Sequence, residues 1–287
     1  MLSTFSIVAV DPQTQEIGIA VQSKFLSVGA VVPWVRSGVG AVATQAFANT
    51  AAGPRALELL ADGASPQEVM DALAGNDEGR ADRQYGIVDL RGRSASYTGD
   101  RCISFAGGIA AQTFAAQGNC LAGSSVVDAL ATGFTSTRGH LADRLVLALQ
   151  AAQREGGDKR GQQSAALIIE KPSGGYAALN DRYVDLRVDD HPAPIDELAR
   201  LLDLHKLYFF PATPEDVLGI DQELGRDIVR NLVRVGALES GDSYDDRAQN
   251  ALVAFMHVEN LENRVRADGT IDRQTLDYLR NFSAASY

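Results

Sequence analysis

The hydrophobic pattern of the first fifty residues predicts two strand pairs. Apolar side chains dominate residues 4–10 and 17–21, and a polar turn at 11–15 separates the two segments. Short apolar runs bounded by turn residues are typical of buried strands. A second pair, at 31–36 and 39–45, flanks a Ser-Gly turn. The chain therefore opens as two β-hairpins, and the first of them begins at Thr4.

Helical and strand patterns alternate through the following 140 residues. A helix is predicted at 51–61, and Ser65-Pro66-Gln67-Glu68 opens another with an N-cap, a proline and an early acid. The later segments are predicted as three strands, two helices and two strands: 84–89, 94–98, 113–118, 125–134, 140–154, 164–170 and 183–188. Strand groups separated by helix pairs indicate a layered α/β protein.

Prolines near 211–214 mark a domain boundary after a predicted helix at 195–204. The remaining pattern predicts three short helices, at 228–235, 246–257 and 273–279. We therefore expect two domains, residues 1–211 and residues 212–287.

Composition narrows the classes of partner. The net charge of −11 and a sequence pI near 4.8 are unfavourable for nucleic acid or an anionic membrane surface, because both require basic patches. We therefore expect a small-molecule partner. The sequence shows neither a secretory leader nor an apolar stretch long enough to span a membrane, so the expected location is the cytoplasm. The two cysteines, Cys102 and Cys120, are expected to be buried small hydrophobes.

Thr4 is the candidate nucleophile, because it places a hydroxyl at the head of a buried hairpin. A threonine with a free α-amine carries nucleophile and general base on one residue, since that amine titrates near neutrality. Met1-Leu2-Ser3 precede it, so a free Thr4 requires cleavage of the Ser3–Thr4 bond. The alternative is an ordinary strand threonine with an acylated nitrogen.

Two further positions are candidates for the catalytic machinery. Lys24 follows the second strand, and its ammonium would lower the pKa of a nucleophile at the start of the first strand. Gln45 and Ala46 lie at the end of the fourth predicted strand, just before a predicted helix. Their backbone N–H groups are candidate hydrogen-bond donors to the oxyanion of the reaction intermediate. The alternatives are a solvated lysine at a strand end and an ordinary strand-to-helix turn.

Five residues are candidates for substrate binding. Arg55, in the first turn of a predicted helix, is suited to clamp a carboxylate or is simply exposed. The other four are Ser23, Asn119, Asp158 and Asp181, at strand ends or in loops, where structural roles such as an Asp181–Arg182 ion pair are the alternative. Histidine and glycine spacings match neither a metal site nor a phosphate loop, so we expect no metal and no cofactor.

Several blocks of sequence, in the same order, resemble one family. They are residues 4–9, 23–34, 40–45, 117–119, 156–166 and 180–192. On these residues the chain resembles the DUF1028 proteins of the N-terminal-nucleophile hydrolase superfamily, over roughly residues 4–210. The resemblance implies an α+β fold, a four-layer αββα sandwich, and hydrolysis of a C–N amide bond. It implies no particular substrate.

The C-terminal segment is similar to a three-helix peptidoglycan-binding domain. The similarity lies in Ile228, Leu232, Val235 and Gly236, in 248–255 and in 268–279, and it departs at Met256, where a glutamine is common. From residue 213 onward there are eight arginines and fourteen acidic residues, which gives a net charge of −6. That charge is unfavourable for an anionic polymer, so packing or dimerisation is expected ahead of binding to peptidoglycan fragments.

Three functions follow from these observations. The first is an amidohydrolase that cleaves a small or peptide-like amide, with Thr4 as nucleophile and a homodimer as the expected assembly. The second is a non-catalytic binding or assembly protein that keeps the αββα scaffold, which the three residues before Thr4 favour. The third is an amidase that acts on peptidoglycan fragments.

Overall fold

The computed structural model describes residues 4–283, and its N-terminal part is built on two antiparallel sheets. The larger has the strand order β10-β9-β2-β1-β8-β7 and comprises β1 (Thr4–Asp11), β2 (Glu16–Ser23), β7 (Gly107–Ala111), β8 (Phe114–Asn119), β9 (Ser164–Glu170) and β10 (Arg182–Val188). The smaller has the order β3-β4-β5-β6 and comprises β3 (Pro33–Arg36), β4 (Gly40–Ala46), β5 (Arg83–Asp89) and β6 (Ser94–Thr98).

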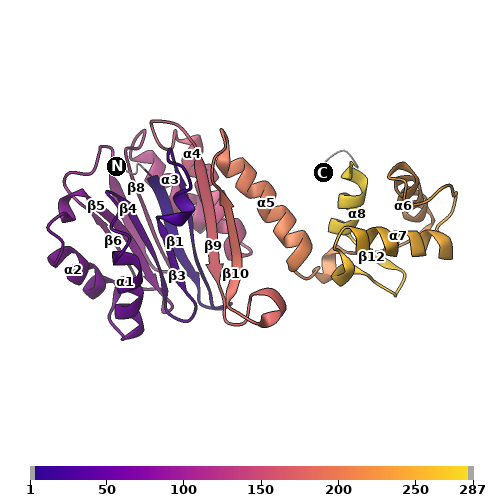
Figure 1. Cartoon of the computed structure of the whole chain (residues 1–287), viewed down its shortest axis with the longest axis horizontal. Coiled ribbons are helices and arrows are strands. Elements are labelled where there is room, and N and C mark those ends of the chain that lie inside the picture. The colour runs from indigo at the N-terminus through magenta and orange to yellow at the C-terminus, as the bar shows by residue number, and fades with distance from the viewer. Residues whose placement is uncertain (1–3, 284–287) are drawn as a thin grey trace. The chain divides into compact units, whose positions relative to one another are not determined.

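The sheets stack face to face, and a helix pair covers each outer face (Figure 1). Helices α1 (Ala52–Ala61) and α2 (Pro66–Gly75) pack on the smaller sheet. Helices α3 (Ser125–Ser136) and α4 (Leu141–Arg154) pack on the larger one. The inner contacts join β1 and β2 to β4, and β8 to β5. This arrangement confirms the predicted α+β class, and the contacts follow the order that an αββα sandwich requires.

Successive side chains of a strand point to opposite faces of its sheet, and this alternation explains the layers. In β1, Val8 and Val10 face the second sheet and pack with Ala41 and Ala43 of β4, whereas the residues between them face α3 and α4. Both faces of β1 are therefore buried, as its almost continuous apolar run requires.

Local signals in the sequence account for how the helices begin and pack. Ser65 and Glu68 form the expected capping box at the start of α2. In α1, Gly53 lies against the indole of Trp34, and a Cβ there would come within 2.3 Å of the ring. Glycine thus allows α1 to approach β3 closely.

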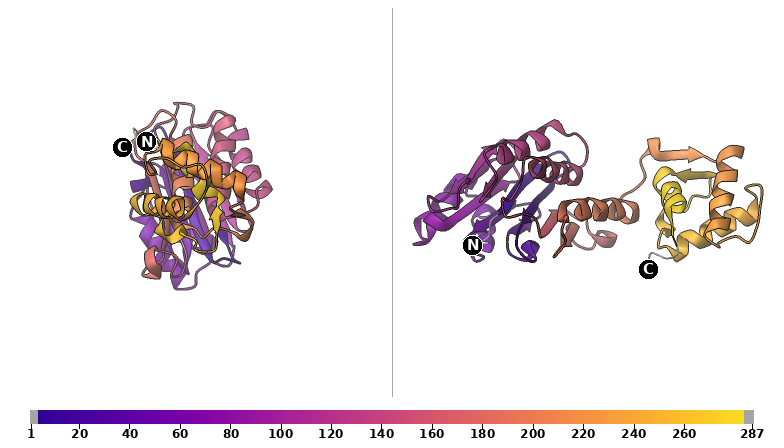
Figure 2. Two further views of the ribbon diagram at one scale, coloured as in Figure 1. Left: turned by 90° about the vertical axis from the view of Figure 1, so that its right-hand side faces the viewer. Right: turned by 90° about the horizontal axis from the view of Figure 1, so that it is seen from above.

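The chain divides into two compact units, residues 1–202 and 203–287, and α5 (Pro194–Phe209) runs through the division. The boundary predicted from the proline cluster in the sequence lies at 211/212. The second unit contains η4 (Pro214–Asp216), β11 (Val217–Gly219), α6 (Gln222–Arg234), α7 (Asp246–Val258), β12 (Thr270–Asp272) and α8 (Arg273–Asn281), coloured orange to yellow in Figure 2.

The second unit has its own apolar core. Leu232, Phe255 and Leu276 pack there, one from each of its helices. The buried guanidinium of Arg264 pairs with Asp272 and donates to main-chain carbonyls at the end of α5. It therefore satisfies carbonyls that the end of a helix leaves without partners.

No helix within residues 4–283 combines the length and apolar character that crossing a bilayer requires.

Candidate functional site

At one end of the sheet interface the apolar core gives way to a polar cluster. Seven hydroxyl and amide side chains, each 0% exposed, make up this cluster: Thr4, Ser6, Ser23, Gln45, Gln84, Gln117 and Asn119. In the larger sheet Thr4 pairs with Ser23 of β2 on one side and with Asn119 of β8 on the other. The register therefore brings three of the predicted site residues side by side.

Thr4 lies within this cluster through both its side chain and its backbone. Its Oγ1 donates a hydrogen bond to Ser23 Oγ at 3.2 Å. Its carbonyl oxygen accepts from Gln45 Nε2 at 3.4 Å, across the gap between the sheets. The candidate nucleophile is thus held by a hydroxyl in its own sheet and by an amide in the facing sheet.

Gln84 connects the two sheets at this end. Its Oε1 accepts from Gln45 Nε2 at 2.8 Å and from Asn119 Nδ2 at 2.9 Å. Its Nε2 donates to Gly118 O at 2.8 Å and to Thr98 Oγ1 at 2.9 Å. Because a buried amide is costly unless it is hydrogen-bonded, these contacts fix the position of Gln84 and of its partners.

Ser6 forms the inner boundary of the cluster. Its Oγ donates to Gln45 Oε1 at 2.6 Å and accepts from Gln117 Nε2 at 2.7 Å. The amide of Gln117 lies over Gly86 of β5, where an added Cβ would come within 2.0 Å of Gln117 Oε1. Glycine at 86 therefore makes room for the amide.

Two acceptors in the cluster have no hydrogen-bond partner among residues 4–283. They are Asn119 Oδ1, on the residue beside Thr4, and Gln117 Oε1. A buried acceptor without a partner costs about 1–3 kcal/mol. Such groups call for a partner, such as an ordered water, an ion or a ligand group.

The cluster contains no imidazole, carboxylate or amine. Within residues 4–283 no group of three or more His, Cys, Asp or Glu side chains is arranged to hold a metal ion. A base on the same residue would be the Thr4 nitrogen, which is an amide in the printed sequence. Met1, Leu2 and Ser3 lie outside the described residues.

Ala46 ends β4 in a left-handed conformation, with φ of 66°. This conformation costs an alanine about 1 kcal/mol relative to the right-handed region, so the surrounding structure enforces it. Helix α1 begins at Ala52, after a loop rather than directly after the strand. The next amide, Phe47 N–H, donates to Asp82 O at 2.9 Å.

Lys24 is exposed beside the cluster. Its ammonium donates to Gln162 O at 3.2 Å, and its backbone N–H donates to Asp158 Oδ2 at 3.1 Å. The Asp158 side chain is fully buried and pairs with Arg160 at 2.8 Å. Asp158 therefore ties the loop after β2 to the loop before β9.

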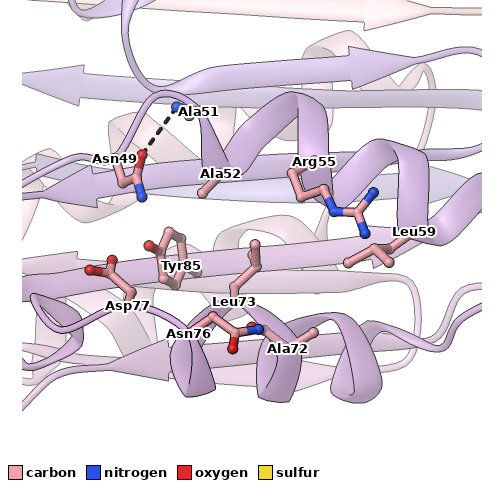
Figure 3. Close-up of a pocket in the computed structure, with 10 residues that line it drawn as sticks. All are labelled: Asn49, Ala51, Ala52, Arg55, Leu59, Ala72, Leu73, Asn76, Asp77 and Tyr85. Carbon is pink, nitrogen blue, oxygen red and sulfur yellow. Dashed lines mark hydrogen bonds between the residues drawn. The ribbon is translucent and has the colours of Figure 1, made fainter.

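Arg55 lies elsewhere, in a pocket between α1 and α2 on the outer face of the smaller sheet (Figure 3). Its guanidinium pairs with Glu58 at 3.0 Å, and both side chains are more than half exposed. The pocket has a volume of about 350 Å³ and is lined by Asn49, Ala51, Ala52, Arg55, Leu59, Ala72, Leu73, Asn76, Asp77 and Tyr85.

The hydroxyl of Tyr85 points toward Asp77 in this pocket (Figure 3). Burial, with a contribution from the negative charge of Asp77, raises the pKa of Tyr85 to about 12. Hydrogen bonds from Arg83, together with one from Gly79 N–H, lower the pKa of Asp77. The pocket therefore contains an anionic carboxylate and a neutral phenol at neutral pH.

Asp181 is at the opposite end of the sandwich. Its Oδ1 accepts from Ser173 N–H at 2.8 Å, which orders the loop between β9 and β10. Arg182 pairs with Glu170 and Asp185, not with Asp181. The structure therefore does not bring Asp181 together with Thr4.

Sequence reasoning did not select Ser6, Gln84 or Gln117. A usable signal was present, because each is a polar residue inside a buried strand whose other residues are mostly apolar or glycine. Pairing between strands then brings these isolated polar positions to one end.

Comparisons with known proteins agree with this architecture. A family model described as "Family of unknown function (DUF1028)" matches residues 4–198. A second, described as "Putative peptidoglycan binding domain", matches residues 208–279. A crystal structure of protein SPO2555 from Silicibacter pomeroyi, titled as a DUF1028 protein, is 33% identical and superposes with a TM-score of 0.66.

That match covers 73% of this chain and 88% of the Silicibacter chain. A search of functionally curated proteins found no match. The family match spans more than half of the sequence, and the chain belongs to the DUF1028 family.

Proposed function

We propose that the protein is an amidohydrolase in which Thr4 attacks the carbonyl carbon of a small amide. The observation that carries this proposal is the placement of the Thr4 hydroxyl at the head of β1, in a buried cluster without a carboxylate, imidazole or amine. Such a cluster can orient a nucleophile but cannot take its proton. The proposal therefore includes release of the Thr4 α-amine as the base.

Maturation is one hydrolysis step. Water adds across the Ser3–Thr4 peptide bond, which leaves a carboxylate on Ser3 and an amine on Thr4. The unpartnered Asn119 Oδ1 lies on the residue paired with Thr4, and it is suited to accept a hydrogen bond from that new amine. Cleavage would thus supply a donor where the cluster lacks one.

Catalysis then proceeds in two halves. Thr4 Oγ1 attacks the amide carbonyl while its proton passes to the α-amine and on to the leaving nitrogen, so that an ester to Thr4 forms and an amine departs. Water, deprotonated by the same α-amine, hydrolyses the ester and restores the hydroxyl. Backbone N–H groups at Gln45 and Ala46 are the proposed oxyanion donors, and Ser23 Oγ orients the nucleophile. The charge of Lys24 favours the unprotonated amine.

The direct test is N-terminal sequencing and intact mass of the purified full chain. We expect wild type and Thr4→Ser to begin at residue 4 and Thr4→Ala to keep its first three residues. A β-lactone of a carboxylic acid should then leave an acyl group on the peptide that begins with Thr4. A wild-type chain that remains uncleaved and is not acylated would refute the proposal.

A second candidate is a binding or assembly protein without catalysis. The observation that favours it is the complete burial of the Thr4 hydroxyl, which is already hydrogen-bonded to Ser23. This function predicts an uncleaved chain and a Thr4→Ala variant whose assembly state, measured by light scattering, equals that of wild type. The homodimer expected from the superfamily is measured in the same experiment.

The C-terminal family match adds a narrower alternative, an amidase acting on peptidoglycan fragments. The acidic character of residues 213–287 opposes it, since the polymer is itself anionic. Cosedimentation of the full chain with purified peptidoglycan at low and moderate salt decides it. Binding would support a wall-derived substrate, and its absence would leave the domain with a packing role.

A further inference from the structure

Exposed apolar side chains gather at the end of the sandwich that holds Thr4. Phe25 and Leu26 follow β2, Phe47 follows β4, and Ile103 precedes β7; their exposed fractions run from 38% to 59%. All four lie in loops at the Thr4 end, because the register places Ser23, Ala46 and Gly107 there. Several exposed apolar groups at the same end of the sandwich are candidates for a binding surface.

Hydrogen bonds join these loops into one continuous rim. Lys24 N–H donates to Asp158, and the next residue, Lys159, donates from its N–H to Cys120 O and from its ammonium to Ser104 O. Cys120 N–H in turn donates to Ile103 O at 2.7 Å. The loops after β2, before β7 and before β9 are therefore fastened to one another.

The loop that carries Phe47 is fastened to its neighbours in the same way. Phe47 N–H donates to Asp82 O, and the Asp82 carboxylate pairs with Arg101, two residues before Ile103. Arg83 lies over the Phe47 ring, 5.4 Å from its centre. We call Lys24, Phe25, Leu26, Phe47, Ile103 and Lys159 the rim.

The rim carries two ammonium groups without an anionic partner among the described residues. Lys24 and Lys159 donate to main-chain carbonyls only. The other two lysines of the chain, Lys171 and Lys206, form ion pairs with Glu16 and Asp203. Two ammonium groups that pair with no carboxylate of residues 4–283 are candidates to contact an anionic ligand.

The carboxylates at this end are of two kinds. Asp82 and Asp158 each pair with an arginine. Asp189 and Asp190 are exposed, and Asp190 accepts from the neutral Gln163 amide at 3.1 Å. Asp100 is exposed and forms no ion pair among residues 4–283, so a test of the rim must include a cationic ligand.

We propose that the rim selects an amide that carries both an apolar acyl group and a carboxylate, that is, an N-acyl amino acid. The carboxylate contacts Lys24 and Lys159, the acyl group packs on Phe25 and Phe47, and the scissile amide reaches Thr4. The inference rests on the proposed function for the cleavage step, but recognition is measurable without it.

Arg55 is the competing carboxylate site. It lies between α1 and α2, on the face of the smaller sheet that is turned away from the polar cluster, and it already pairs with Glu58. A substrate whose amide lies at the sheet interface is therefore better matched to the two rim lysines.

The test is calorimetric binding of N-phenylacetylglycine, its neutral carboxamide and N-phenylacetyl-ethylenediamine to the full chain, with ligand integrity followed by mass spectrometry. We expect the carboxylate to bind at least about tenfold more tightly than the other two. Lys24→Gln and Lys159→Gln should each remove most of this preference, and Phe47→Ser should weaken all three ligands.

Matched controls lie at the opposite end of the sandwich. Arg91→Gln removes an exposed cation there, and Leu179→Ser removes a side chain that is 83% exposed. Both should bind the three ligands as wild type does. Equal binding of the three ligands, binding of none, or sensitivity to Arg55→Gln instead of the lysine variants would overturn the inference.

The two proposals can fail separately. Charge-dependent binding of a ligand that stays intact would support the rim and refute hydrolysis of that class by Thr4. Equal rates of hydrolysis of the carboxylate ligand and its neutral carboxamide, both insensitive to Lys159→Gln, would support catalysis and refute the rim.

Discussion

The two ends of the sheet interface are built from opposite kinds of side chain. At one end Val8, Val10, Ile17 and Ile19 pack against Ala41, Ala43 and Val88. At the other, hydroxyls and amides connect the same strands through hydrogen bonds, and two acceptors are left without partners. Strands β1, β2, β4 and β5 contribute to both ends.

The two ends of the sheet interface therefore have different roles, one in stability and one in positioning side chains. Apolar burial stabilises the interface by roughly 25 cal/mol for each Å² removed from water and does not depend on direction. The amide network depends on direction and leaves groups unsatisfied, so it contributes less stability but holds atoms in fixed positions. We therefore expect substitutions at the two ends to affect different measurements.

Thr4→Ala should produce the largest effect, and it should act mainly on amide hydrolysis. Removal of the nucleophile is expected to lower amide hydrolysis by about 10³-fold or more. The hydroxyl makes one hydrogen bond through its own proton, so the free energy of unfolding should fall by only about 1 kcal/mol. Hydrolysis of the ligand identified by binding, followed by mass spectrometry, checks the first number, and urea unfolding checks the second.

Ile19→Ala should have the reverse profile. Ile19 is fully buried in the apolar half, and its truncation leaves a cavity that costs about 3 kcal/mol in unfolding free energy. Catalysis per folded molecule should not change. Ile19→Val, with a cost of about 1 kcal/mol, is the graded control. An Ile19→Ala variant as stable as Thr4→Ala would contradict the division between the two ends.

Gly86→Ala tests the steric limit of the polar end. The new Cβ would overlap the Gln117 amide, and we expect a loss of about 1–3 kcal/mol in urea unfolding. Gly75→Ala is the matched control, because nothing lies within 4 Å of its Cβ position and helix α2 gains from alanine.

A double variant tests whether Gln117 is the side chain that limits the space at Gly86. In the double variant Gly86→Ala/Gln117→Ala the clash is removed, so the loss should be smaller than the sum of the two single losses. Additive losses would show that Gln117 does not limit the space at Gly86.

Asp77→Asn tests the pocket between α1 and α2 through the pH dependence of the unfolding free energy. Hydrogen bonds from Arg83 hold the pKa of Asp77 below its ordinary value, and its side chain is 15% exposed. The stabilisation of about 1–2 kcal/mol is therefore present above pH 4 and is lost as the pH falls through the folded-state pKa.

The measurement is the difference in unfolding free energy between wild type and Asp77→Asn from pH 7 to pH 3. Asp62→Asn, at an exposed position after α1, is the control and should show no such trend. A difference that grows on acidification would show that the sign is wrong.

Hydrophobic patterning was sufficient to predict most of the fold. Strand β9 has the predicted bounds, and α3 and α4 begin within one residue of their predicted starts. These segments have strong periodicity and clear end signals. The pattern missed β7, because Gly107-Gly108 weaken strand propensity and Ile109 is its one large apolar residue.

The site was predictable only where a residue had a local reason to stand out. Thr4 did, as a hydroxyl at the head of a strand, and so did Asn119 at the end of one. Gln84 did not, because its role depends on contacts with Gln45 and Asn119, each more than thirty residues away. Arg55 was selected for its helix position, which carried no information about the face it lies on.

The hydrogen bonds of Gln84 also have a consequence for sequence change over time. One oxygen accepts from Gln45 and from Asn119, so loss of Gln84 removes a hydrogen bond from two buried amides at once. A relative that replaces Gln84 should therefore carry replacements at the other two positions as well. We expect positions 45, 84 and 119 to be inherited as a set, with intermediates that change one alone being rare.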